Sequence, residues 1–351
     1  MAYTTIDNPE LYFQTKLWTG TGSSNALTLD GSEDMQPDLV WIKARSEARN
    51  HKMFDSVRGV TKVLGFNESE AETTVATSLT AFGSDGFTVS SDVSVNENTE
   101  TFVAWCWKAS GSTASNTDGS ITSTVSANTT AGFSVGTFTK DGDTTVGHGL
   151  GSTPSLIIAR AKDQSGSWRI WHSSFGANEY MDLDTDGAKA TSTTIWQNTL
   201  PTSSVFSMGS LFDSVASYFL SFTEKQGFSK FGKYTGNGNA DGTFIYTGFR
   251  PAFVIFKRSD SGTENWGIID SKRSYHNVGN HTLATNSQNA ESSYGGGESV
   301  GGASNKVDLV SNGIKIRENS AYNNTSSGTY IYMAFAEQPF VNSNGVPCNA
   351  R

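Results

Sequence analysis

Three segments of the chain open in the same way, and this repetition limits the possible folds more than any other feature of the sequence. Each opening starts at a proline and runs through an apolar stretch to a basic residue, a polar turn and a second apolar run. The prolines are Pro37, Pro154 and Pro251, the basic residues are Lys43, Arg160 and Lys257, and the second runs end in Phe54-Asp55-Ser56, Trp171-His172-Ser173 and Ile269-Asp270-Ser271. From the proline to Asp55, His172 or Asp270 the distance is 18, 18 and 19 residues. Spacing kept this closely indicates a repeated module.

Each module also has a lead and a closing part. A Thr- and Gly-rich lead precedes each proline, and a short strand followed by a strongly apolar run closes each module. The short strands lie in SDGFTVS, SSVFSMG and SNGIKIR, and the closing runs are ETFVAWCWKA, SYFLSFTEKQGF and GTYIYMAFAEQPF. Gly86 and Gly313 precede two of the short strands, as turn residues that can adopt φ > 0 at no cost. The third module is longer because of the stretch from Ser292 to Asn305, which we interpret as a flexible surface insertion.

Composition and periodicity predict an all-β protein. A hydrophobic content of 36% indicates a globular chain, and the alternation in GFTVSSDVSV, FVAWCWK and TYIYMAFAE favours antiparallel strands. We expect three repeated antiparallel β-sandwich modules with jelly-roll-like connectivity. The expected boundaries are an N-terminal arm 1–15, module 1 at 16–109, a linker with an edge strand at 110–130, module 2 at 131–227, module 3 at 228–340 and a C-terminal tail 341–351.

Charge and cysteine content disfavour several classes of protein. The net charge is −9 and the chain has no extended Lys/Arg cluster, so binding of nucleic acid is disfavoured. No secretory signal and no run of 18 apolar residues is visible, so we expect no membrane insertion. Cys106 lies in a predicted core strand and Cys348 in the polar tail, which predicts two free thiols and fits folding in a reducing cytoplasm.

One acidic motif has the pattern of a metal site. Asp182, Asp184 and Asp186 alternate and are followed by Gly187, as in the opening of a calcium loop. The twelfth position, where such a loop has a bidentate glutamate, is Thr193. The alternative is a surface strand that ends in an Asp-Gly turn, and the sister modules lack the acidic triplet. We therefore expect no cofactor and keep the triplet only as a weak calcium candidate.

The polar residues of the modules favour structural roles over catalysis. His172 occupies the position of Asp55 and Asp270, and all three side chains can accept a hydrogen bond from a nearby backbone N–H. No G-x-S-x-G motif is present, and adjacent His172 and Ser173 would point to opposite faces of a strand. We expect no enzyme activity, although a glycosidase pair among the 34 acidic residues stays open as an alternative.

Three aromatic residues in polar surroundings are the candidates for ligand binding. Trp196 lies among loop residues, and Tyr275 and His276 follow the Asp-Ser strand of the third module. A pyranose offers an apolar face and hydroxyl groups, so aromatic rings beside Asn and Ser suit a sugar. The alternative is packing between modules or subunits.

The segment TTAGFSVGTFTKDGDTTVGHGLGSTPSLIIARAKDQSGSWRIWHSS resembles a β module found in tail-fibre-like and other virion proteins of tailed bacteriophages, notably marine ones. The opening MAYTTIDNPELYFQTKLWTGTGS and the closing TYIYMAFAEQPF are similar to members of the same group. The resemblance covers nearly the whole chain, and its motifs mark the module without marking a chemistry.

This resemblance implies a bacteriophage virion structural protein, namely a tail fibre or receptor-binding component for host attachment. The implied location is the virion, assembled in the host cytoplasm. The implied partners are other virion proteins and a host surface glycan or receptor, and we expect a homo-oligomer because virion appendages are closed symmetric assemblies by default. The chain lacks the heptads of long fibre shafts. A capsid decoration or tail accessory protein is therefore the second hypothesis, and a glycan-cleaving tail enzyme is the third.

Overall fold

A computed structural model describes residues 2–142, 144–279, 281–291 and 306–348. The expected insertion at 292–305 lies outside the described residues. Within them, the only α-helices are the four-residue α1 (Val93–Asn96) and α2 (Thr193–Trp196), with 3-10 turns η1 (Pro9–Leu11) and η2 (Ser210–Phe212). All sheets are antiparallel, so the all-β prediction is confirmed. None of these helices is long and apolar enough to cross a membrane.

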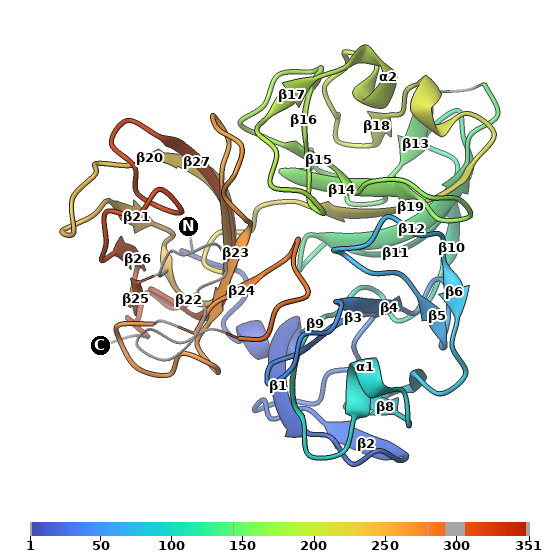
Figure 1. Cartoon of the computed structure of the whole chain (residues 1–351). Coiled ribbons are helices and arrows are strands. Elements are labelled where there is room, and N and C mark those ends of the chain that lie inside the picture. The colour runs from blue at the N-terminus through green and yellow to red at the C-terminus, as the bar shows by residue number, and fades with distance from the viewer. Residues whose placement is uncertain (1, 143, 280, 292–305, 349–351) are drawn as a thin grey trace. The chain divides into compact units, whose positions relative to one another are not determined.

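The chain divides into two compact units, both visible in Figure 1. The larger unit contains residues 11–184 and 190–223, and the smaller unit contains residues 1–10, 185–189 and 224–351. The first ten residues therefore belong to the same unit as the C-terminal third of the chain.

The first half of the larger unit contains two main sheets, with strand orders β1-β9-β3-β4 and β2-β8-β7, and the pair β5-β6. The strands are β1 (Phe13–Thr19), β2 (Asn25–Thr28), β3 (Leu39–Ala44), β4 (Lys52–Asp55), β5 (Lys62–Val63), β6 (Thr73–Thr74), β7 (Leu79–Gly83), β8 (Gly86–Val89) and β9 (Thr101–Trp107).

The second half contains a long sheet of order β10-β11-β12-β19-β14-β15-β16-β17 and the pair β13-β18. Its strands are β10 (Ala114–Asn116), β11 (Ser123–Asn128), β12 (Phe133–Thr139), β13 (Thr145–Gly147), β14 (Leu156–Ala161), β15 (Arg169–His172), β16 (Glu179–Asp182), β17 (Ala190–Thr191), β18 (Val205–Ser207) and β19 (Ala216–Phe222). The expected edge strand near Ser123 is β11, which has a neighbour on both sides. The sheet edge is β10, inside the expected linker.

The smaller unit contains sheets of order β20-β27-β22-β23-β24 and β21-β26-β25. Its strands are β20 (Ser229–Thr235), β21 (Phe244–Tyr246), β22 (Phe249–Arg258), β23 (Gly267–Asp270), β24 (Leu283–Ala284), β25 (Val307–Val310), β26 (Gly313–Ile316) and β27 (Thr329–Pro339).

One order of strands occurs three times along the chain. In each case the lead strand pairs with the closing strand, and the closing strand pairs with the proline strand, which follows Pro37 or Pro154 or contains Pro251. The proline strand then pairs with the second apolar run, which gives the orders β1-β9-β3-β4, β12-β19-β14-β15 and β20-β27-β22-β23. The short strands β8, β18 and β26 pair with β2, β13 and β21 in separate sheets. The segments that repeat in the sequence therefore occupy the same places in three sheets.

The larger unit has a core between its first two sheets. Val40, Ile42 and Phe102 pack there with Leu27 and Phe87 of the opposite sheet. Alternate residues of a strand point to opposite faces, yet Trp41 and Lys43 on β3, and Trp105 and Trp107 on β9, are buried as well. Both strands are thus covered on two faces, so the alternation expected in FVAWCWK does not separate a buried face from an exposed one.

The second face of this sheet is covered by residues of the following loop and of the next segment. The Trp41 ring lies 4.4 Å from the Phe66 ring, and Phe66 lies 4.6 Å from Trp168, measured between centroids. The Trp168 indole N–H donates to the carbonyl of Gly65 at 2.7 Å. The first two segments therefore share one continuous aromatic core inside the larger unit.

The two turn glycines differ in backbone conformation but both allow a close approach of the neighbouring strand. Gly86 adopts a φ of +123°, as its expected turn role requires. Gly313 is not among the residues with positive φ, so that part of the prediction is wrong. Instead, a Cβ atom at Gly313 would lie 2.2 Å from the Ile245 carbonyl oxygen, and one at Gly86 would lie 2.0 Å from that of Leu27. Each glycine allows the backbone of the partner strand to come close.

Candidate functional site

The Asp/His position of the modules has the structural role that the sequence predicts. Asp55 Oδ1 accepts the backbone N–H of Arg58 at 2.9 Å, and Asp270 Oδ1 accepts that of Arg273 at 2.8 Å. His172 Nδ1 lies 3.1 Å from the donating N–H of Ser174. The three side chains are buried. Each fixes the turn that follows its strand and is not available to a substrate.

The basic residue that ends each proline strand is also buried and bound. Lys43 Nζ donates to the Ala44 carbonyl at 2.6 Å, and Lys257 Nζ donates to that of Arg258 at 2.7 Å. Arg160 has 0% exposure and donates from Nε to the Ala161 carbonyl at 2.9 Å. The recurrence of one contact in three sheets indicates a role in the scaffold.

The buried amine of Lys257 predicts a measurable pH dependence of stability. Burial lowers the pKa of Lys257 from 10.5 to about 8. Between pH 8 and 10.5 the unfolded state therefore binds more protons than the folded state, and stability rises with pH in this window. From pH 7.5 to pH 10, we expect the free energy of unfolding of the wild type to rise by on the order of 2–3 kcal/mol more than that of a Lys257→Met variant. Urea unfolding of both proteins at pH 7.5 and 10 measures the difference, and parallel pH profiles would contradict it.

The acidic triplet is used for internal contacts. Asp182 accepts two bonds from Arg169 Nη1, at 2.6 and 2.8 Å, and Asp184 accepts the backbone N–H of Trp168 at 3.0 Å. Asp186 is exposed. Across the described part of the chain, no three His, Cys, Asp or Glu side chains are placed to hold a metal ion. The calcium candidate is therefore not carried further.

Trp196 is not on the surface where the sequence placed it. It ends α2 with 2% exposure, because the Ser192 side chain caps this helix and the turn folds the ring inward. Ser192, a preferred N-cap residue type in the polar stretch TSTTIW, is the signal in the sequence from which this turn could have been predicted. A Trp196→Ala variant would report on folding and not on binding.

Tyr275 and His276 do form an exposed pair. The Tyr275 side chain is 68% exposed, and its ring centroid lies 4.0 Å from that of His276. The pair follows β23 in the smaller unit, whereas Trp196 belongs to the larger unit. The three candidates therefore do not share one unit.

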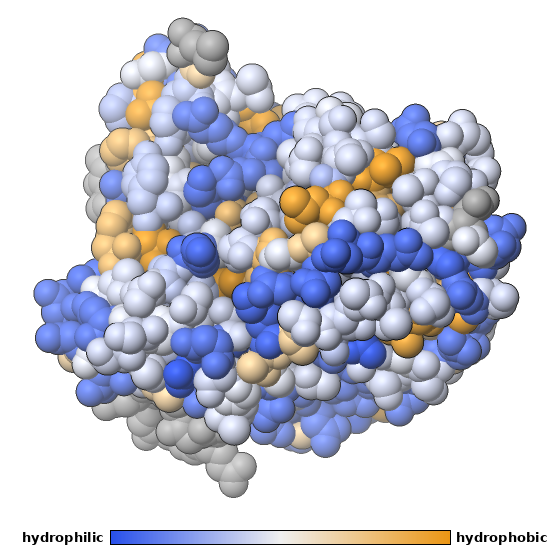
Figure 2. All heavy atoms as spheres, turned by 90° about the horizontal axis from the view of Figure 1, so that it is seen from above, coloured by the Kyte–Doolittle hydropathy of each residue, from blue (hydrophilic) through white to orange (hydrophobic). Residues whose placement is uncertain are grey.

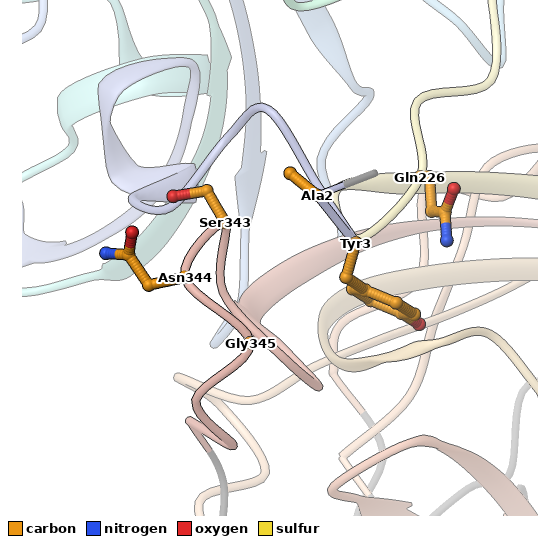
Figure 3. Close-up of a pocket in the computed structure, with 6 residues that line it drawn as sticks. All are labelled: Ala2, Tyr3, Gln226, Ser343, Asn344 and Gly345. Carbon is orange, nitrogen blue, oxygen red and sulfur yellow. The ribbon is translucent and has the colours of Figure 1, made fainter.

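The smaller unit contains an open hollow of about 610 Å³. Its lining consists of Ala2, Tyr3, Gln226, Ser343, Asn344 and Gly345. In Figure 3 the ring of Tyr3 and the amide of Gln226 point in one direction, whereas the side chains of Ser343 and Asn344 point away from them. The volume lies in the range of ligand pockets, roughly 300–1,000 Å³.

Two sets of hydrogen bonds fix the walls of this hollow. The Tyr3 hydroxyl donates to the Gly248 carbonyl at 2.8 Å and lies 3.3 Å from the Tyr246 hydroxyl. Burial, and then the contact with Tyr246, raise the pKa of Tyr3, so its hydroxyl keeps its proton. On the other side, the Asp7 carboxylate accepts the backbone N–H of Ser343 at 2.6 Å. The N-terminal residues are thus ordered against the C-terminal turn.

The surface also has exposed apolar side chains. Figure 2 shows hydrophobic patches separated by hydrophilic residues on the face that it draws. The large exposed ones include Val60, Val93, Leu200, Leu211 and Val346. Two aromatic residues on β21, Phe244 and Tyr246, are 46% and 53% exposed. The sequence analysis did not single out Phe244, Tyr246 or Tyr3. The structure shows Phe244, Ile245 and Tyr246 as exposed, buried and exposed, which is the period of a half-buried strand. All three are apolar or aromatic, so the sequence gives no signal for this alternation.

Comparison with known proteins yields one family. Its profile matches residues 8–339, and its description is a domain of unknown function (DUF7483). No curated protein and no solved structure matches the chain.

Proposed function

The chain belongs to the DUF7483 family, and we propose that it is a structural protein of a bacteriophage virion that serves attachment to the host cell. The similarity of its β modules to tail-fibre-like virion proteins supports this function. The proposed partners are other virion proteins and a host surface glycan or receptor. Several copies on one particle would act together, so that each site can bind weakly.

The recurrence of one strand order is the observation that carries this proposal. The order found in β1-β9-β3-β4 is that of β12-β19-β14-β15 and of β20-β27-β22-β23. We interpret it as three copies of one jelly-roll-like sandwich module, the first of which begins with β1 at Phe13, inside the expected arm 1–15. Repeated β modules with buried, internally bonded polar groups make a rigid scaffold that presents ligand contacts on its surface.

We propose binding without catalysis. The polar groups that recur in the modules are engaged inside the scaffold: Asp55 and Asp270 each hold a buried arginine, and the His172 ring accepts a bond from its own turn. A catalytic acid or base has to reach its substrate. These groups are buried, and their bonding accounts for them without a reaction.

Binding of the purified full-length chain to intact host cells tests the proposal. We expect saturable binding that slows adsorption of the phage. Because Tyr275 is 68% exposed, Tyr275→Ala should raise the half-saturating concentration several-fold while leaving stability within about 0.5 kcal/mol. The control Val93→Ala, at a 44% exposed position, should bind as the wild type does.

A chain that ignores host cells and stays on tailless heads would contradict host attachment and identify a decoration protein. Unchanged binding by Tyr275→Ala would exclude the Tyr275–His276 pair as a receptor contact.

A further inference from the structure

The outer face of β21 presents two aromatic rings on one edge of a sheet. β21 is the edge strand of the order β21-β26-β25, and Phe244 and Tyr246 lie two residues apart on the same face, about 7 Å from one another. Tyr246 is opposite Gly313 in the register, so its cross-strand partner has no side chain. The Phe244 ring lies across the same glycine, where a Cβ atom would be 2.9 Å from it.

This aromatic face continues into the hollow through the contact between the Tyr3 and Tyr246 hydroxyls, which are 3.3 Å apart. The hollow adds the ring of Tyr3 and the exposed amide of Gln226, which point in one direction (Figure 3). The backbone here is fixed, because Asn342 Oδ1 accepts the N–H groups of Asn344 at 3.0 Å and Val346 at 2.9 Å.

We propose that Tyr3, Gln226, Phe244 and Tyr246 form a binding site for a neutral glycan, and we call them the Tyr246 surface. The inference rests on the proposed function, because it assigns the receptor class and a site to host attachment. The rings of Phe244 and Tyr246 stack on the C–H faces of neighbouring sugar units. The Gln226 amide and the tyrosine hydroxyls exchange hydrogen bonds with sugar hydroxyls.

The chemistry of the surface selects a neutral sugar over other ligands. None of the six residues that line the hollow is charged. One cation on the same face of the sheet, Lys315, is opposite Phe244 and pairs with Asp241 at 2.7 Å. An anionic ligand would find no uncompensated cation among these residues, whereas amphipathic rings with a neutral amide match a pyranose.

The test is binding of the full-length chain to an array of printed bacterial surface polysaccharides and neutral oligosaccharides, and to intact host cells. We expect the wild type to bind at least one neutral glycan. Tyr246→Ala should weaken this binding roughly fivefold to tenfold, the effect of losing one aromatic contact. The control Leu200→Ala, at a 54% exposed position of the larger unit, should bind as the wild type does. Circular dichroism checks that both variants are folded.

Two results would overturn the site while leaving host attachment intact. One is cell and glycan binding by Tyr246→Ala at wild-type strength. The other is a wild type that binds cells but no glycan on the array, and that no longer binds the cells after they are treated with protease. This result would identify a protein receptor. Failure of the wild type to bind either cells or glycans would contradict the proposed function itself.

Discussion

Replacing Arg160 by methionine should lower the free energy of unfolding by about 5 kcal/mol. The buried guanidinium donates to the carbonyls of residues 68–70 at 2.6–3.0 Å and lies 4.9 Å over the Trp168 ring. Methionine fills much of the volume but removes four hydrogen bonds from a charged donor, one to the buried Ala161 carbonyl and three to part-buried carbonyls, and a hydrogen bond to a charged group contributes about 1.5–3 kcal/mol. Burial lowers the pKa of Arg160 to about 10, so the charged form persists at pH 7. Urea unfolding followed by tryptophan fluorescence measures the loss.

Arg49→Met is the matched control in the same unit. Arg49 pairs with Glu100 at 2.7 Å, but its side chain is 28% exposed. The pair is partly exposed and bidentate, with a second bond from Arg49 Nε at 2.9 Å, so we expect Arg49→Met to cost about 1–2 kcal/mol, well below the loss expected for Arg160→Met. Losses of equal size in the two variants would show that Arg160 does not join the first two segments as described.

The second large effect is expected from Asp270→His. Asp270 and Arg273 form a fully buried pair, with 2.5 Å between Oδ2 and Nε. Without the carboxylate, Glu291 at 3.2 Å remains as an acidic partner of the buried arginine. Removal of one member of a buried pair costs about 3–5 kcal/mol, and we expect about 4 kcal/mol, measured by urea unfolding.

A double variant tests whether the modules are equivalent at this turn. The second segment has His172 and Phe175 at the corresponding positions, with ring centroids 5.7 Å apart. Asp270→His combined with Arg273→Phe copies this arrangement and removes both charges of the Asp270–Arg273 pair. Because Glu291 retains His281 at 2.8 Å, the double variant should recover at least half of the loss. A double variant less stable than Asp270→His alone would contradict the equivalence.

The repeated strands could be predicted because each is a local signal. The proline, the basic end of the strand and the Asp/His turn lie within 20 residues, and their bonds are made within the same span. Gly313 shows the limit of this reasoning. Its need for glycine comes from the Ile245 carbonyl, on a strand more than sixty residues earlier, and a sequence does not reveal which carbonyl lies opposite.

Exposure was the hardest property to predict. Trp196 lies among polar residues, yet a four-residue helix turns its ring inward. Tyr246 has a similar polar setting, but its neighbour in the sheet is a glycine and its ring stays exposed. The hollow was not predictable, because it joins Ala2 and Tyr3 to a turn at residues 343–345. Pairing over this distance depends on tertiary packing, and no local pattern specifies it.

The most direct test of the virion assignment is antibody labelling. An antibody raised against the chain would be applied to intact, purified particles of the phage that is proposed to encode it, and the particles viewed by electron microscopy. Host attachment predicts label on the tail appendages. Label spread over the head, or no label on any particle, would contradict the account.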